Sequence, residues 1–224
     1  MSLTVISPPT LFEACCDSVA SARHAQELGA GRIELCGAGA GGTTPSLGLI
    51  ARCRDEIYVP LHVMIRAHTR DFNYSSEDLE VMKNDIVAAR ALGVDGIVIG
   101  ILHGDHTIDV QRMAEVIQLA RPLKVTFHRA FDVTPDASAA LDALLMLGVD
   151  YVLTSGQAAS ALDGVDALQA LQQQAGDKLT VLAGGGVRAH NVRDVVRRSG
   201  VREVHANGID PMIVRDVMLA LSGG

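Results

Sequence analysis

The chain has 224 residues, a net charge of −7 and an apolar fraction of 48%, enough for one large core or two smaller ones. Aromatic residues make up only 3% and tryptophan is absent, so the core must consist of aliphatic side chains. The acidic balance, without any block of lysine or arginine, argues against nucleic acid and anionic membranes as partners. No apolar run has the length of a membrane span, and the N-terminus lacks a secretory pattern, so we expect a cytoplasmic protein.

Short runs rich in valine, isoleucine and leucine have the length and composition of buried strands. They are residues 11–16, 32–36, 60–66, 96–102, 124–128, 151–155, 179–184 and 201–206. The stretches that follow them show helical spacing, and many begin at a capping residue and end at glycine. They are residues 18–30, 46–57, 75–93, 109–121, 138–148, 163–176, 190–200 and 210–221.

Strict alternation of strands and helices predicts parallel strands joined by crossover helices. Eight such units in a chain of this length close naturally into a (β/α)8 barrel, the TIM barrel. We therefore expect a single α/β domain over residues 1–224, with residues 1–10 as an N-terminal extension. The alternative is an open doubly wound sheet, but no strand leads into a G-x-G-x-x-G turn and helix.

Two-residue alternation along five of the strands predicts a polar set of side chains inside this barrel. The inward residues would be Glu13 and Cys15, Glu34 and Cys36, His62, Met64 and Arg66, Thr126 and His128, and Glu203 and His205. Charges in a barrel interior cost several kcal/mol per ion unless they are paired. They therefore indicate either an ion-pair network that fixes strand register or a site whose ligand or metal uses the same charges.

The stretch KVTFHRAFD, residues 124–132, ends in an imidazole, a cation and a carboxylate. Active sites of (β/α)8 barrels lie at the carboxyl ends of the strands, where this stretch and the other polar positions would meet. The candidate catalytic residues are Glu13, Glu34, Arg66, His128, Arg129, Asp132 and His205. We expect His128 or a glutamate to act as general acid or base, and Arg66 to hold a negative charge.

Two loops after later strands are candidates for anion binding. Gly184, Gly185 and Gly186 directly precede a helix, and barrels of this class often bind phosphate after their seventh and eighth strands. Ser155 lies in the TSGQ loop after the sixth strand. We expect these residues to form an anion site, although a tight turn alone would also require glycine.

Cys15 and Cys36 lie near the ends of adjacent predicted strands, and both should face inward. Neighbouring strands are about 4.8 Å apart, so two thiolates at these positions could bind a soft ion such as Cu(I). The alternative is that both are small buried hydrophobic residues, which free cysteines commonly are. Cys16 should face the helices and Cys53 lies within a helix, so packing is expected for both.

Several segments, taken together and in this order, resemble the motif series of the CutC family, which is named for copper homeostasis. They are FEACCDS, RIELC, GGTTPSLG, RDFNYS, VTFHRAFD, VLTSG, AGGGVR and REVHA. The resemblance implies a (β/α)8 barrel, a cytoplasmic setting and self-association into a homo-oligomer. It also implies a role in copper handling with copper bound at cysteine, and Cys15, Cys16 and Cys36 occupy family cysteine positions. No established reaction comes with the family.

Two functions from different classes remain open. The first is a CutC-like copper homeostasis protein that binds Cu(I) without turnover. The second is a metal-independent enzyme that acts on a small phosphorylated or carboxylated metabolite at the carboxyl ends of the strands. A scaffold barrel is a third possibility, but a purely structural barrel has no need for inward charges.

Overall fold

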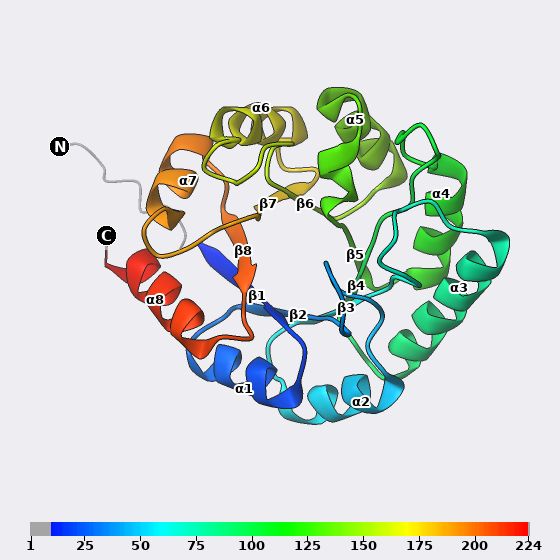
Figure 1. Cartoon of the computed structure of the whole chain (residues 1–224), viewed down its shortest axis with the longest axis horizontal. Helices are drawn as coiled ribbons and strands as arrows, with labels where there is room; N and C mark the ends of the chain where they lie inside the picture. Colours follow the sequence, from blue (N-terminus) through cyan, green and yellow to red (C-terminus); the bar gives the residue numbers. More distant parts are fainter. Residues whose placement is uncertain (1–9, 224) are drawn as a thin grey trace.

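The computed structural model describes residues 10–223, which form a closed ring of parallel strands surrounded by helices (Figure 1). The strands are β1 (Leu11–Cys16), β2 (Arg32–Leu35), β3 (Leu61–Met64), β4 (Gly96–Ile99), β5 (Lys124–Phe127), β6 (Tyr151–Thr154), β7 (Thr180–Ala183) and β8 (Glu203–Asn207). Each strand pairs with its neighbours in sequence, and β8 pairs with β1 to close the ring. The predicted TIM-barrel fold is confirmed.

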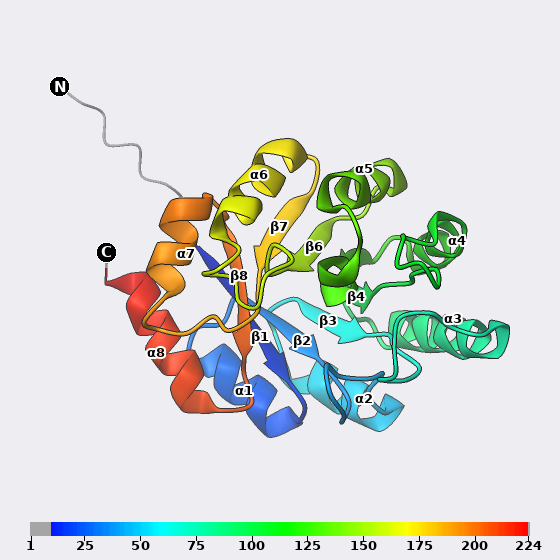
Figure 2. The ribbon, with the colours of Figure 1, turned by 45° about the horizontal axis from the view of Figure 1, so that its top comes forward.

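One α-helix follows each strand on the outside of the ring (Figures 1 and 2). The helices are α1 (Val19–Glu27), α2 (Leu47–Glu56), α3 (Ser76–Ala91), α4 (Val110–Ala120), α5 (Ala137–Leu147), α6 (Val165–Ala175), α7 (Val192–Ser199) and α8 (Pro211–Ser222). A short 3-10 helix, η1 (Arg129–Val133), follows β5 and was not predicted. The single domain with an N-terminal extension stays a prediction, because residues 1–9 lie outside the described part of the chain.

Local sequence explains where several helices begin and end. Ser75 accepts a hydrogen bond from Asp78 N, and the Asp78 side chain accepts one from Ser75 N, which is the capping box that starts α3. Ser18 begins α1 in the same way. Gly148 ends α5 in a left-handed conformation with φ 68°, which glycine adopts without steric cost. These signals explain why α1 and α3 begin, and α5 ends, close to the positions predicted from the sequence.

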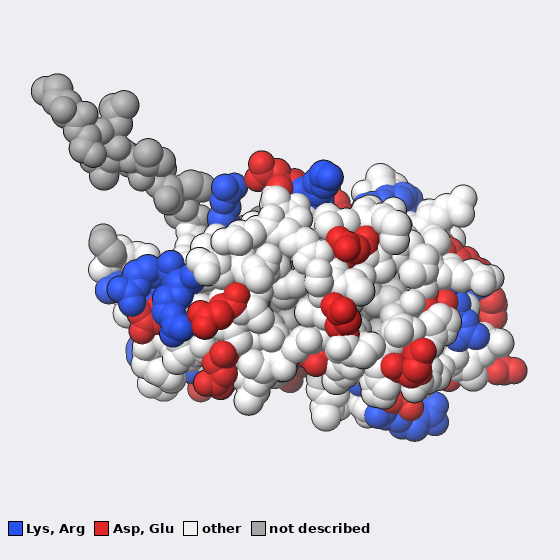
Figure 3. Space-filling model, turned by 90° about the horizontal axis from the view of Figure 1, so that it is seen from above, with Lys and Arg blue, Asp and Glu red and all other residues white. Residues whose placement is uncertain are grey.

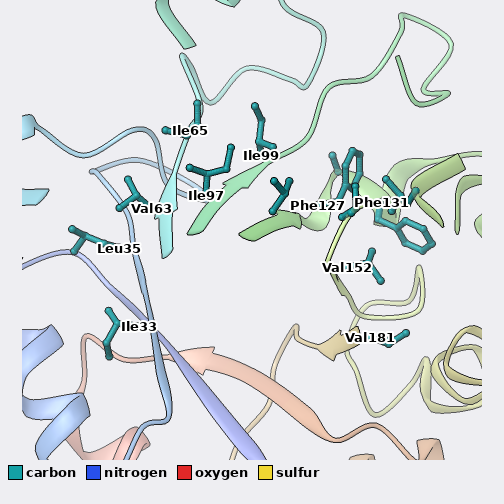
Figure 4. Packing of buried hydrophobic residues seen from close by; sticks show 14 of the residues in the cluster. Ile33, Leu35, Val63, Ile65, Ile97, Ile99, Phe127, Phe131, Val152 and Val181 are labelled. Carbon is teal, nitrogen blue, oxygen red and sulfur yellow. The ribbon is translucent and has the colours of Figure 1, made fainter. Parts of the chain in front are cut away.

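The main hydrophobic core lies between the strands and the helices (Figure 4). Alternate strand residues such as Ile33, Leu35 and Val63 point outward into this layer and are completely buried. Cys16 and Cys53 belong to the same cluster, so their predicted packing role is confirmed. Because this apolar set takes the outward face, the intervening residues of each strand face the barrel interior.

The outer surface carries charges of both signs. On the face shown in Figure 3, lysine and arginine are interspersed with aspartate and glutamate in small groups. Exposed ion pairs such as Arg23 with Glu56 contribute little to stability. Within residues 10–223, no helix has both the length and the apolar character that crossing a membrane would require.

Candidate functional site

A cavity of about 340 Å³ opens at the carboxyl ends of the strands, at the lower end of the ~300–1,000 Å³ typical of small-molecule sites. Predicted site residues on its wall are Cys15, Glu34, Cys36, Arg66, His128, Arg129 and His205. Apolar contacts come from Met64, Phe72 and Leu153. The structure therefore brings most of the predicted residues together around one space, while Glu13 lies deeper in the barrel.

The deeper charges are compensated by Arg32, which the sequence analysis did not select. Its Nε donates to Glu13 Oε2, and its Nη2 donates to Glu203 Oε2 at 2.6 Å. Its guanidinium carbon also lies 4.5 Å from the centre of the Tyr151 ring. Burial favours a protonated Glu13, but Arg32 and His205 outweigh it and hold the pKa of this carboxyl well below its usual range. Arg32 is two residues before Glu34 on the same strand, so the two-residue alternation that predicted an inward Glu34 also predicts an inward Arg32.

His205 links this network to the cavity. Its Nδ1 lies 2.8 Å from Glu13 Oε1, and its Nε2 lies 3.6 Å from Glu34 Oε2. Burial opposes the charged form, but Glu34, Cys15 and Glu13 together raise the pKa of His205 well above its usual value. Burial also raises the pKa of Glu34. The ring of His205 thus lies on the cavity wall between Glu13 and Glu34.

Cys15 and Cys36 lie side by side on that wall, with their Sγ atoms 3.5 Å apart. The hydrogen bond with Cys36, together with His205, lowers the pKa of the Cys15 thiol well below its usual value. The same hydrogen bond, with burial, raises the pKa of Cys36. Cys36 Sγ also lies 3.5 Å from Glu34 Oε2. One oxygen and two sulfur ligands, from Cys15, Glu34 and Cys36, fall within 4.8 Å of one another and could hold a metal ion.

His128 carries a hydrogen-bond donor that meets no acceptor among the residues that the structure describes. Its Nδ1 accepts from Ala130 N at 3.2 Å, so the neutral ring carries its proton on Nε2. That atom is buried and has no partner within residues 10–223. Burial and the Arg66 charge lower the pKa of His128 to about 3. The His128 ring is therefore better suited to donate a hydrogen bond to a ligand than to act as a general base, because a general base needs a pKa nearer neutrality.

Arg66 is a buried cation held by carbonyl oxygens. Its Nη1 donates to Ala40 O at 3.1 Å and Gly42 O at 3.2 Å, and its guanidinium carbon lies 4.8 Å from the centre of the Phe72 ring. Its Nε has no hydrogen-bond partner in the described part of the chain. The glycine-rich loop after β2 thus presents carbonyl groups to a cation.

Asp132 and Ser155 join η1 to the loop after β6 and do not line the cavity. Asp132 accepts hydrogen bonds from Ser155 N at 3.0 Å and Gln157 N at 3.2 Å, and it pairs with Arg129 Nε at 2.7 Å. The Ser155 hydroxyl donates to Ala158 O at 2.6 Å. The side chains of Asp132 and Ser155 thus hold neighbouring backbone segments together. Arg129 lines the cavity, but its charge is already paired with Asp132.

The glycines after β7 also lie off the cavity wall. Gly184 N donates to Thr154 O in the strand ladder, and Gly185 O accepts from Ala161 N. Gly185 and Gly186 have φ of 99° and 70°, which the turn requires of glycine. Anion binding by Ser155, Gly184, Gly185 and Gly186 stays a prediction.

Two further glycines, on and just after β4, leave room for histidine rings and were missed in the sequence. A Cβ at Gly96 would lie 2.6 Å from His62 Cδ2, and one at Gly100 would lie 2.5 Å from His128 Cε1. We expect Gly100→Ala to displace His128 and to lower the free energy of unfolding in urea by about 1–3 kcal/mol, the usual cost of overpacking.

The matched control for that substitution is Gly48→Ala in α2, where an added Cβ meets no atom within 4 Å. It should leave stability unchanged or raise it by up to about 1 kcal/mol, because alanine is the better helix former. Equal stabilities of the two alanine variants would contradict the packing argument for Gly100.

The fold and the cavity together define a TIM-barrel protein whose carboxyl-end pocket holds paired thiols, buried histidines and an arginine without an ionic partner in the described residues. The profile of the CutC family matches residues 10–210. The chain belongs to the CutC family, as the motif resemblance predicted.

Curated relatives include the copper homeostasis protein cutC homologs of Mus musculus and Homo sapiens. They are 46% and 45% identical over 198 residues, which is 88% of this chain and 73% and 72% of those proteins. The crystal structure of copper homeostasis protein CutC from Streptococcus agalactiae superposes with a TM-score of 0.84 at 30% identity, covering 88% of this chain and 97% of that one. A thiamine phosphate pyrophosphorylase from Pyrococcus furiosus, at 16% identity and a TM-score of 0.66, shares the fold alone.

Proposed function

We propose that this protein serves copper homeostasis by binding Cu(I) at Cys15 and Cys36. The observation that carries the proposal is the pair of sulfur atoms 3.5 Å apart on the cavity wall. Thiolate is the ligand that Cu(I) prefers, and the thiolate form of cysteine is the one that binds metals. The names of the relatives, which describe copper homeostasis, support the same metal.

The surroundings of the two sulfurs suit a soft ion. Met64 packs against Cys36 and brings a thioether into the same small cluster, and thioethers are also ligands for Cu(I). Glu34 adds a carboxyl oxygen near Cys36. Each of the four cysteines is free, which fits a reducing compartment where a thiolate site survives.

The test is competition for Cu(I) between the protein and a chromogenic chelator. We expect one Cu(I) per wild-type chain. Cys15→Ser and Cys36→Ser should each weaken Cu(I) binding at least about 100-fold, because each removes a direct ligand. Loss of a residue that only contacts a ligand usually weakens metal binding ~10–100-fold. Cys53→Ser is the matched control, because Cys53 packs in α2 away from the cavity. Unchanged affinity in both cavity variants would remove the proposal.

Cytoplasmic location and assembly into a homo-oligomer are further parts of this proposal, and they come from the family resemblance. Analytical ultracentrifugation of the full chain tests the assembly. A single species with the mass of one chain at working concentration would contradict it.

A second candidate function is an enzyme for a small carboxylated or phosphorylated metabolite. The specific observation in its favour is that copper at Cys15 and Cys36 leaves Arg66 and His128 unused. Both side chains line the same cavity, and each has a buried nitrogen atom without a partner within residues 10–223.

A further inference from the structure

We propose that Arg66 and His128 form a subsite that binds the carboxylate group of a small organic acid inside the cavity. The inference deepens the second candidate function and rests on it, in that it requires a ligand in this pocket. It does not depend on copper binding, because neither side chain belongs to the cysteine site.

The first step is the buried charge of Arg66. Its side chain is 6% exposed, and it makes no ion pair with the described residues. Carbonyl groups satisfy Nη1 but carry no net charge, so the cation remains uncompensated. A buried charge without a counter-ion is unfavourable, and a bound anion is the simplest compensation.

The second step is the position of His128 relative to Arg66. Register pairs Met64 with Val98 and Val98 with Thr126, so two residues further along, Arg66, Gly100 and His128 fall at one level. Figure 1 shows β3, β4 and β5 as neighbours in the ring. Because Gly100 has no side chain, the His128 ring fills the space beside Gly100, which lies between Arg66 and His128 in the strand order.

Phe72 then brings the two donors to the same side of the cavity. Its ring centre lies 4.8 Å from the Arg66 guanidinium carbon and 5.1 Å from the centre of the His128 ring. Phe72 itself lines the cavity. Arg66 also contributes to the low pKa of His128, which agrees with this proximity. One cation and one neutral N–H donor therefore lie against the same aromatic ring on the cavity wall.

The chemistry of these donors matches a carboxylate better than a phosphate. Nη1 of Arg66 is occupied by Ala40 O and Gly42 O, which leaves the Nε edge of the planar guanidinium for a ligand. Two parallel N–H groups on one edge fit a planar carboxylate. The nearby glycine loop offers carbonyl oxygens, which repel a phosphate dianion, and the second arginine, Arg129, is neutralised by Asp132.

The wild-type protein provides a test that needs no variant. Binding of propionate, of its uncharged isostere propionamide, and of inorganic phosphate would be followed by NMR titration of the histidine ring signals. Propionate should bind at least about tenfold more tightly than propionamide, because hydrogen bonds to a charged group contribute most. Equal binding of the two, or no binding of either, would overturn the proposal, and tighter binding of phosphate would assign the subsite to phosphoryl groups instead.

Variants locate the effect. Arg66→Gln should weaken propionate binding at least about tenfold and change propionamide binding little. Arg23→Gln is the control and should stay within about twofold, because Arg23 pairs with Glu56 on the surface and does not line the cavity. Equal losses in the two variants would contradict the assignment to Arg66.

Copper affinity separates the two proposals. Arg66→Gln should bind Cu(I) as tightly as the wild-type protein, because Arg66 does not belong to the cysteine site. If propionate fails to bind while Cu(I) binds, only the subsite is wrong. If propionate binds and Cu(I) does not, the carboxylate subsite stands without the copper role. Should Arg66→Gln fail to fold, the comparison of propionate with propionamide in the wild type still decides the matter.

Discussion

Replacing Arg32 with leucine is expected to lower the free energy of unfolding by about 3–5 kcal/mol, which is the usual effect of removing one partner from a buried ion pair. Arg32 is 3% exposed and is the cation shared by Glu13 and Glu203. Without it, Glu13 remains completely buried with only His205 as an ionic partner. Urea denaturation of the wild-type and variant chains at neutral pH measures the difference.

Two comparisons make this prediction specific. Arg23→Gln removes an arginine from the exposed pair with Glu56 and should cost less than about 1 kcal/mol. Arg32→Lys keeps the charge but cannot form both directional contacts, so its loss should lie between the two. If Arg32→Leu cost no more than Arg23→Gln, the interior network would not be what stabilises β1, β2 and β8.

The second large effect is a loss of stability in acid that depends on two buried histidines. Burial lowers the pKa of His62 to about 4 and, with the Arg66 charge, that of His128 to about 3, against about 6.5 in an unfolded chain. Because the folded-state pKa is depressed, the unfolded chain takes up protons first as pH falls. The contribution of each histidine to the free energy of unfolding is therefore complete above about pH 6.5. It declines as the pH falls from there to the pKa of that histidine in the folded state.

The measurement is the free energy of unfolding, determined over a range of pH for the wild-type chain and for each of the variants His62→Gln and His128→Gln. The quantity compared is the wild-type value minus the value of the variant. This difference should shrink by about 1.4 kcal/mol for each pH unit between about pH 6 and pH 5. Contributions from other groups largely cancel in such a difference. Above about pH 7.5 the curves should run parallel, which is the internal control. A difference independent of pH throughout would show that these imidazoles titrate in the folded barrel as they do in the unfolded chain, and would contradict the prediction.

The two proposals use different parts of one cavity. Cys15 and Cys36 come from β1 and the end of β2, whereas Arg66 and His128 follow β3 and β5. A soft ion needs the sulfur atoms, and an organic acid needs the nitrogen donors. An occupied subsite would therefore place a small ligand in the same enclosed space as the metal, so binding of one is expected to alter binding of the other.

Strand and helix order, and the faces of the strands, followed from sequence alone. Side chains alternate along a strand whatever surrounds it. The spacing of Glu34 within β2, and of Arg66 and His128 just beyond β3 and β5, was enough to predict that all three face the barrel interior. The observed strands are shorter than predicted at several ends, because polar residues such as Arg66 and His128 already lie in the loops that form the cavity. The CutC motifs were equally visible, since they are local stretches of sequence.

What only the tertiary structure decided is which polar group meets which. Closing the ring puts β1 between β2 and β8, so Glu13 on β1 meets Arg32 on β2 and forms an ion pair with it. Arg66 meets backbone carbonyl groups instead of a carboxylate. The tertiary structure also turns Asp132 toward the backbone of Ser155 and away from the cavity. The physical reason is that alternation is a property of single strands, whereas a partner is set by distances between segments far apart in the chain. Periodicity therefore determined the inner face, and barrel closure determined its chemistry.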